Sequence, residues 1–97
     1  MGEYFSLKDV LNNDVDECGW QNGTARNLNC PVCGDNFQHV GKDVGEPRLI
    51  DGQNAYAAWD GKGDLVVVPV VGECGHKWEL CFGFHKGNTA AFARTLD

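Results

Sequence analysis

Basic residues are scarce in this chain of 97 residues. It has 8 Lys and Arg against 14 Asp and Glu, which leaves a formal net charge of −6 at pH 7. Nucleic-acid-binding proteins usually concentrate Lys and Arg on one face. The charge balance therefore argues against a large phosphate-binding surface, and we do not expect nucleic acid as a partner.

Long apolar runs and targeting signals are also missing. No stretch approaches the ~20 apolar residues that cross a bilayer. The first residues, 1–5, lack the charged and then apolar pattern of a secretory signal. The chain has five cysteines, an odd number, so a framework of disulfide bonds would leave one cysteine unpaired. We expect a cytoplasmic protein with reduced thiols and no membrane association.

The length predicts a single domain over residues 1–97. We expect residues 1–28 to form a helix and an acidic loop, and residues 29–97 to form a β core. A chain this short buries a limited core, so a bound metal would add useful stability.

A short helix is predicted at the N-terminus, over residues 6–11. Ser6 is a good N-cap and Asp9 follows three residues later, as in a weak capping box. Residues 14–29 are polar and contain several glycines, which indicates a loop in which Trp20 packs on the main domain. Residues 1–20 carry a net charge of −4, which we interpret as a solvated face, with a surface for a basic partner as the alternative.

Strands are predicted over the rest of the chain, at 37–40, 48–50, 65–71, 74–84 and 89–94. Residues 65–71 are β-branched on both faces, which is typical of a central strand, although Pro69 indicates an edge or a bulge. Between residues 74 and 84 the even positions hold a series of ligand-type, aromatic and aliphatic side chains. Because alternate side chains of a strand share a face, that face is predicted to run from the metal ligands into an aromatic core.

Two thiols separated by two residues, Cys30 and Cys33, are followed by glycine and form half of a tetrahedral metal site. Cys74 is the predicted third ligand. His76 is preferred as the fourth, because it shares a strand face with Cys74, whereas Cys81 points to the opposite face unless the strand contains a bulge. Two weaker alternatives for the fourth position are Cys18 and His39.

The predicted metal is a structural Zn²⁺. Four protein ligands close a zinc site, whereas a catalytic zinc keeps one position open for water. We therefore expect no enzymatic activity and name no catalytic residue.

Several segments together resemble a known group of proteins. They are Cys30-Pro31-Val32-Cys33-Gly34, Phe37-Gln38-His39, and the stretches 59–65, 72–80 and 83–89. Over about residues 28–94 the chain resembles small zinc-ribbon proteins encoded by phages of actinobacteria. The resemblance implies a zinc-ribbon-like β fold with ligands at Cys30, Cys33, Cys74 and His76. The second half of the site departs from the common Cys-x-x-Cys knuckle of zinc ribbons.

These proteins are mostly of unassigned function, so the resemblance implies no activity. The expected fold is mainly β, a zinc-ribbon-like antiparallel sheet with a short N-terminal helix. The expected function is a protein-binding module, as a phage factor acting on a host protein in the host cytoplasm. The alternative is a ribbon that binds nucleic acid or is linked to transcription.

Overall fold

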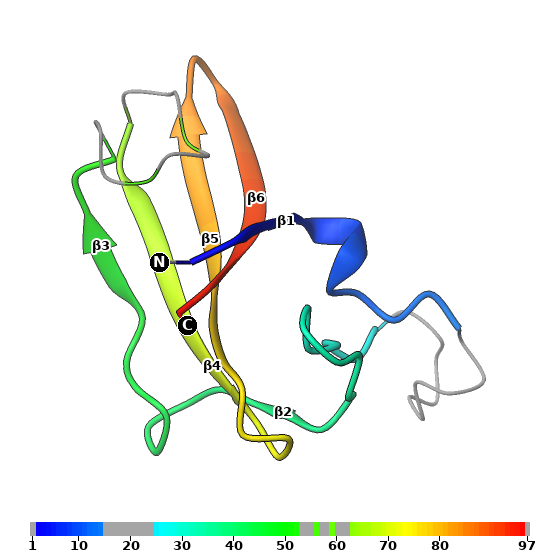
Figure 1. Ribbon diagram of the computed structural model, residues 1–97. Helices are drawn as coiled ribbons and strands as arrows, with labels where there is room; N and C mark the ends of the chain where they lie inside the picture. The colour runs from blue at the N-terminus through cyan, green and yellow to red at the C-terminus, as the bar shows by residue number, and fades with distance from the viewer. Residues whose placement is uncertain (1, 15–24, 53–55, 57–58, 60–62, 97) are drawn as a thin grey trace.

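The fold is an antiparallel sheet of six strands, seen here in a computed structural model that describes residues 2–14, 25–52, 56, 59 and 63–96 (Figure 1). The strands are β1 (Tyr4–Ser6), β2 (Gln38–His39), β3 (Arg48–Ile50), β4 (Leu65–Gly72), β5 (Lys77–His85) and β6 (Asn88–Thr95). Their order is β1-β6-β5-β4-β2, and β3 also pairs with β4. The prediction of a mainly β, antiparallel fold is confirmed. Its identity as a zinc ribbon stays a prediction.

The long hairpins form where the sequence predicts them. β4 and β5 pair in register from Val71 with Lys77 to Leu65 with Gly83. β5 then turns into β6 through Lys86 and Gly87, which both have positive φ, of 51° and 86°. Two-residue turns with positive φ match the twist of the strands that they join. These two hairpins form the centre of the sheet.

Pro69 occupies a local edge within the long strand β4. On the side away from β5, β3 pairs with Leu65 to Val67 and β2 pairs with Val71 and Gly72. Among the described residues no strand faces Pro69 on that side. The N–H of Gly72 donates to His76 O in the hairpin, so odd-numbered residues of β4 direct their amides away from β5. The N–H that proline lacks would point into this gap, so the predicted edge position is confirmed.

The predicted helix over residues 6–11 is wrong in its extent. Only a single 3₁₀ turn forms, η1 (Leu7–Asp9). Its start is as expected, because the Ser6 amide and hydroxyl both donate to the Asp9 carboxylate, at 3.1 and 2.8 Å. Beyond it, Val10 O accepts the amide of Asn29 at 2.7 Å. Pairing with this distant segment takes the backbone groups that a longer helix would use.

Buried side chains lie on both faces of the sheet, not on one. Trp78 belongs to a cluster with Val10, Val70 and Ala93. On the opposite face Cys81 packs with Leu65 and Val67. The prediction that one face of β5 runs into an aromatic core is therefore only half right. Trp78 is buried, but Phe84 on the same face is 56% exposed. Trp20 and Cys18 lie outside the described residues.

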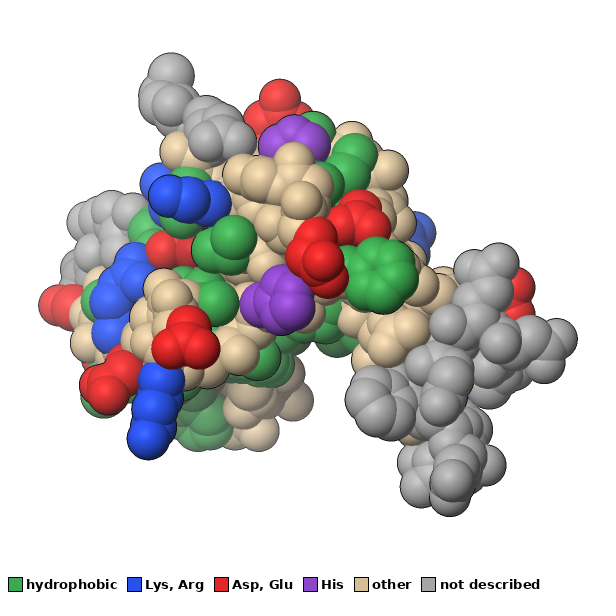
Figure 2. Space-filling model, turned by 90° about the horizontal axis from the view of Figure 1, so that it is seen from below, with side chains coloured by type: hydrophobic (Ala, Val, Ile, Leu, Met, Phe, Trp, Pro, Cys, Tyr) green, Lys and Arg blue, Asp and Glu red, His purple; other side chains and the backbone are tan. Residues whose placement is uncertain are grey.

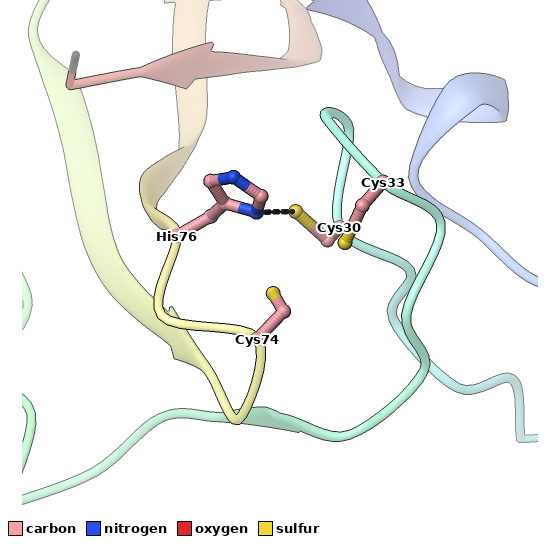
Figure 3. Close-up of side chains that lie close together, drawn as sticks. All are labelled: Cys30, Cys33, Cys74 and His76. Carbon is pink, nitrogen blue, oxygen red and sulfur yellow. Dashed lines mark hydrogen bonds between the residues drawn. The ribbon is translucent and has the colours of Figure 1, made fainter.

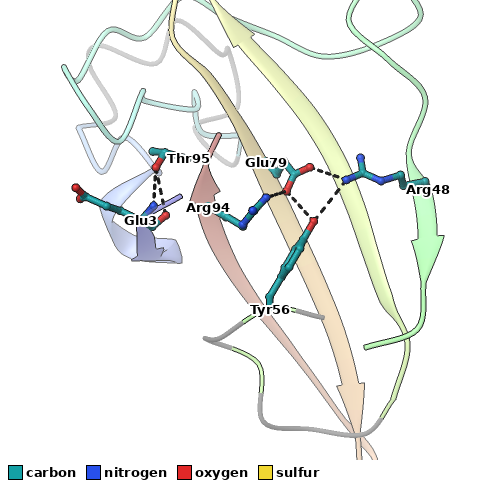
Figure 4. A network of polar contacts seen from close by, with 6 residues as sticks. All are labelled: Glu3, Arg48, Tyr56, Glu79, Arg94 and Thr95. Carbon is teal, nitrogen blue, oxygen red and sulfur yellow. Dashed lines mark hydrogen bonds and ion pairs between the residues drawn. The ribbon is translucent and has the colours of Figure 1, made fainter. Parts of the chain in front are cut away.

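A buried carboxylate links three segments on the Cys81 face (Figure 4). Glu79 is 3% exposed and accepts hydrogen bonds from Arg48, Arg94 and Tyr56, at 2.7, 3.0 and 2.9 Å. The Arg94 guanidinium also lies over the Tyr56 ring, 4.4 Å from its centroid. Both arginines and the tyrosine hydroxyl thus compensate one buried charge.

No helix among the described residues is long and apolar enough to cross a membrane.

Candidate metal centre

The first half of the centre is a tight turn shortly after Leu28, which forms an isolated β-bridge with Leu11. The amide of Cys30 donates to Asp35 O, and the amide of Gly34 donates to Cys30 O, both at 2.8 Å. Gly34 has a φ of 82°, which a residue without a β-carbon adopts at little cost. The turn also directs the amide of Val32 at Cys30 Sγ, 3.4 Å away.

The second half is the turn between β4 and β5. The amide of Gly72 donates to His76 O at 3.0 Å, and Gly75 has a φ of 89°. The next amide, that of Glu73, donates to Phe37 O at 2.9 Å and so connects this turn to the segment after the first one. The two turns are thereby held face to face.

The four predicted ligand side chains converge between the two turns (Figure 3). Their ligand atoms, from Cys30, Cys33, Cys74 and His76, all lie within 4.8 Å of one another. Zn–S and Zn–N bonds of about 2.3 and 2.0 Å in a tetrahedron place neighbouring ligand atoms about 3.6 Å apart. Cys30 Sγ and His76 Nδ1 lie at 3.5 Å. The group could therefore hold a metal ion, and its sulfur-rich donor set suits a thiophilic one.

The thiols of the centre differ in acidity. A backbone hydrogen bond from His76, helped by the neighbouring Cys33, His76 and Gln38 side chains, lowers the pKa of Cys74 to about 7. At Cys33 the backbone of Asp35 acts to lower the pKa, but desolvation and the nearby thiols of Cys74 and Cys30 outweigh it and raise the pKa. Three thiols this close repel one another as thiolates, which is the charge distribution that a bound cation relieves.

Two of the alternative ligands, Cys81 and His39, lie elsewhere. Cys81 is buried on the other face of β5, and burial raises the pKa of its thiol to about 12. It is a packing residue, because the thiolate is the form that binds metal. The exposed ring of His39 lies 3.3 Å from a Glu73 carboxylate oxygen, outside the group of four.

Gln38 is a supporting residue that the sequence reasoning missed. Its Nε2 donates to Asp35 O at 2.9 Å and lies 3.9 Å from Cys74 Sγ. Its Oε1 accepts the indole N–H of Trp78 at 2.8 Å. One side chain thus connects the first turn, a ligand and the core. The predicted strand at 37–40 includes Gln38, but an amide on a strand carries no metal-site signal of its own.

No protein-family model, curated protein or solved structure matches this chain. The resemblance to phage zinc-ribbon proteins therefore rests on the sequence motifs alone.

We expect single substitutions to separate His76 from Cys81. His76→Ala removes a donor from the group, so the chain should retain zinc more weakly, with water completing the shell. Cys81→Ala should keep one equivalent of zinc and cost about 1 kcal/mol of packing. Zinc content by atomic absorption and zinc affinity by competition with a chelating dye measure both. Loss of zinc in Cys81→Ala with retention in His76→Ala would reverse the assignment.

Gly72→Ala tests how tightly the two turns approach. A β-carbon at this position would lie 2.6 Å from both Cys74 Sγ and Gln38 Nε2. The amide can move, but a metal-bound sulfur is fixed, so we expect zinc affinity to fall about 10- to 100-fold. Gly87→Ala is the matched control, because it is strained by a φ of 86° but meets no atom within 4 Å. Equal zinc affinities in the two variants would show that the approach at Gly72 is unimportant.

Proposed function

We propose that this protein is a small module held together by one structural Zn²⁺ and that it binds a protein partner. The observation that carries the first part is the convergence of three thiols and an imidazole within 4.8 Å. Zinc is the ion that such Cys₃His sets most often hold in structural sites. All four donors come from the protein and leave no position for a reacting water, which supports a role without catalysis.

The surface around the centre supports the second part of the proposal. Val32, Phe37 and Val40 are 53, 61 and 53% exposed, and they lie within or next to the segments that build the centre. We call these three residues the knuckle patch. Figure 2 views the molecule from the end where β2 and the β4–β5 turn lie, and apolar side chains are exposed there beside acidic ones. Exposed apolar groups bordered by charge are typical of protein-binding surfaces.

The setting of this function follows from the resemblance and is part of the proposal. A phage factor that binds a host protein would act in the host cytoplasm, where thiols stay reduced and are available for zinc.

The test is a capture experiment from host lysate with a matched pair of variants. Val32→Ser/Phe37→Ser should lose a partner that the wild-type protein retains. Leu49→Ser/Phe84→Ser removes two residues that are 67 and 56% exposed on β3 and β5, away from the centre, and should retain it. The knuckle patch is not the docking surface if both double variants retain the same partner or both lose it.

Nucleic acid is the alternative partner, and we expect weak binding or none. Of the eight cations, Arg48 and Arg94 are paired with Glu79. Each phosphate contact needs a cation, and several contacts make affinity fall steeply with salt. Labelled duplex and single-stranded DNA and RNA should therefore show no salt-sensitive binding at micromolar protein. Tight, salt-sensitive binding that Lys77→Glu or Lys86→Glu abolishes would favour the nucleic-acid function.

A further inference from the structure

A hollow of about 580 Å³ opens beside the gap in the edge of β4. The segment between β2 and β3 fills this gap only in part. It leaves the sheet after His39 and approaches β4 at Pro69, where a β-carbon added to Gly45 would lie 3.1 Å from the ring. We call the hollow the edge pocket. Its volume lies within the range of small-molecule sites, about 300–1,000 Å³.

The edge pocket combines apolar and cationic side chains. Its apolar lining residues are Val40, Val44, Pro69, Val71 and Leu96. Its charged lining residues are Lys42 and Lys77, against the single carboxylate of Asp43, and His39 completes the lining. The chain as a whole is acidic, with a net charge of −6, but cations outnumber carboxylates in the lining of this pocket.

The two lysines are available to a ligand. The ion pairs among the described residues engage Arg48 and Arg94 with Glu79, and His39 with Glu73. Neither Lys42 nor Lys77 takes part in them, and both side chains are exposed. They come from different segments, the β2–β3 connection and the start of β5, and reach the same hollow. An anion in the pocket would therefore meet two ammonium groups.

We propose that the edge pocket binds a small amphipathic anion, a carboxylate or phosphate joined to a short apolar body. The ammonium groups of Lys42 and Lys77 bind the anionic group, and the valines, Pro69 and Leu96 cover the apolar body. Lysine donates from a compact charge and fits either anionic group, so the pocket chemistry is shared by the two. This site is separate from the metal centre and from the knuckle patch, apart from Val40, which borders both.

The experiment is a titration of the full-length, zinc-loaded protein followed by amide chemical shifts. Hexanoate and hexyl phosphate are the two anionic probes, hexanol is the neutral probe, and acetate lacks the apolar body. For ligands of this size we expect a Kd on the order of 1 mM. Saturable shifts should centre on residues 40–44, 71 and 77. Hexanol and acetate should each bind at least about fivefold more weakly than the better anion, and added salt should weaken only the anions.

The matched variants are two double substitutions of lysine. Lys42→Gln/Lys77→Gln should weaken the better anion about tenfold, since each exposed charge pair contributes a factor of a few. Lys8→Gln/Lys86→Gln removes the same charge outside the pocket and should leave binding unchanged. The relative affinities of hexanoate and hexyl phosphate identify the preferred anionic group. The proposal is overturned if hexanol binds as well as both anions, if the shifts map elsewhere, or if the two double variants behave alike.

Discussion

Removing the metal should unfold the protein. A structural zinc site contributes about 10–16 kcal/mol of apparent binding free energy, whereas a domain of this size is stable by about 5–15 kcal/mol in total. The metal also cross-links two turns that are separated by the 40 residues between Cys33 and Cys74. Without the metal, closing this long loop costs conformational entropy that no cross-link offsets. The purified protein should release one equivalent of zinc to a chelator under reducing conditions.

Trp78 is a local spectroscopic probe of zinc loss. Its indole N–H donates to Gln38, which in turn lies beside Cys74 Sγ, so opening the centre should disturb the Trp78 environment early. We expect the near-UV circular dichroism and the zinc release to follow one transition, and added Zn²⁺ to restore both. Cys33→Ser should reproduce the loss without a chelator, while Cys81→Ala should behave as the wild type does. A metal-free chain with unchanged near-UV signal and unchanged melting temperature would refute a folding role for the metal.

Cys74 and His76 lie together as predicted, but the predicted strand from residue 74 is wrong: both residues lie in the turn between β4 and β5, and β5 begins only at Lys77. Their grouping comes from this turn, in which Gly75 has a φ of 89°, and not from strand parity. Alternate side chains of a strand share a face whatever the rest of the chain does. Within β5 this rule correctly places Cys81 on the face opposite Trp78, where it is buried with Leu65 and Val67. β4 and β6 were likewise predictable, because their apolar and turn residues are local signals.

The N-terminal segment shows where local signals fail. Ser6 and Asp9 form the expected capping interaction, yet the helix ends after one turn. Three residues of helix gain little on their own. Backbone pairing of Val10 with Asn29, and of Asn12 with Asn27, connects this segment to the start of the metal centre. That competition is between residues far apart in the sequence, and no local pattern reveals it.

The polar contacts of Gln38 and Glu79 are also long-range. Glu79 lies 31 residues from Arg48 and 23 from Tyr56 along the chain, so only the pairing of β3 with β4 and of β4 with β5 brings the three together. Strand alternation alone places Glu79 on the face of β5 that also holds Cys81. In the structure it is a buried charge, and burial makes it a large term in the stability of the sheet.

Replacing Glu79 should therefore destabilise the protein strongly. Glu79→Gln keeps the shape but leaves the charges of Arg48 and Arg94 without their carboxylate. Removing one partner of a buried ion pair costs about 3–5 kcal/mol, and we expect about 3 kcal/mol here because the Arg48 side chain is 49% exposed. For a domain of this size that lowers the melting temperature by roughly 10–20 °C. Glu46→Gln, an exposed carboxylate outside these ion pairs, is the control and should change it little.

The pH dependence of the melting temperature, compared between the wild type and Glu79→Gln, tests whether the lost carboxylate charge causes the loss of stability. Burial acts to raise the pKa of Glu79, but the hydrogen bonds from Arg48, Tyr56 and Arg94 outweigh it and hold the pKa below its ordinary value of 4.5. A carboxyl group with a lowered pKa in the folded state stabilises that state above pH 4.5, and the contribution fades as the pH falls below 4.5 and through the folded-state pKa. Glutamine does not titrate, so the difference in melting temperature between the wild type and Glu79→Gln should be full at pH 6–7 and shrink below pH 4.5. Acid release of zinc would itself unfold both proteins, so zinc content is measured at each pH and the comparison uses only pH values at which both retain one equivalent. A difference that stays constant across this range would assign the loss to packing and not to the buried charge.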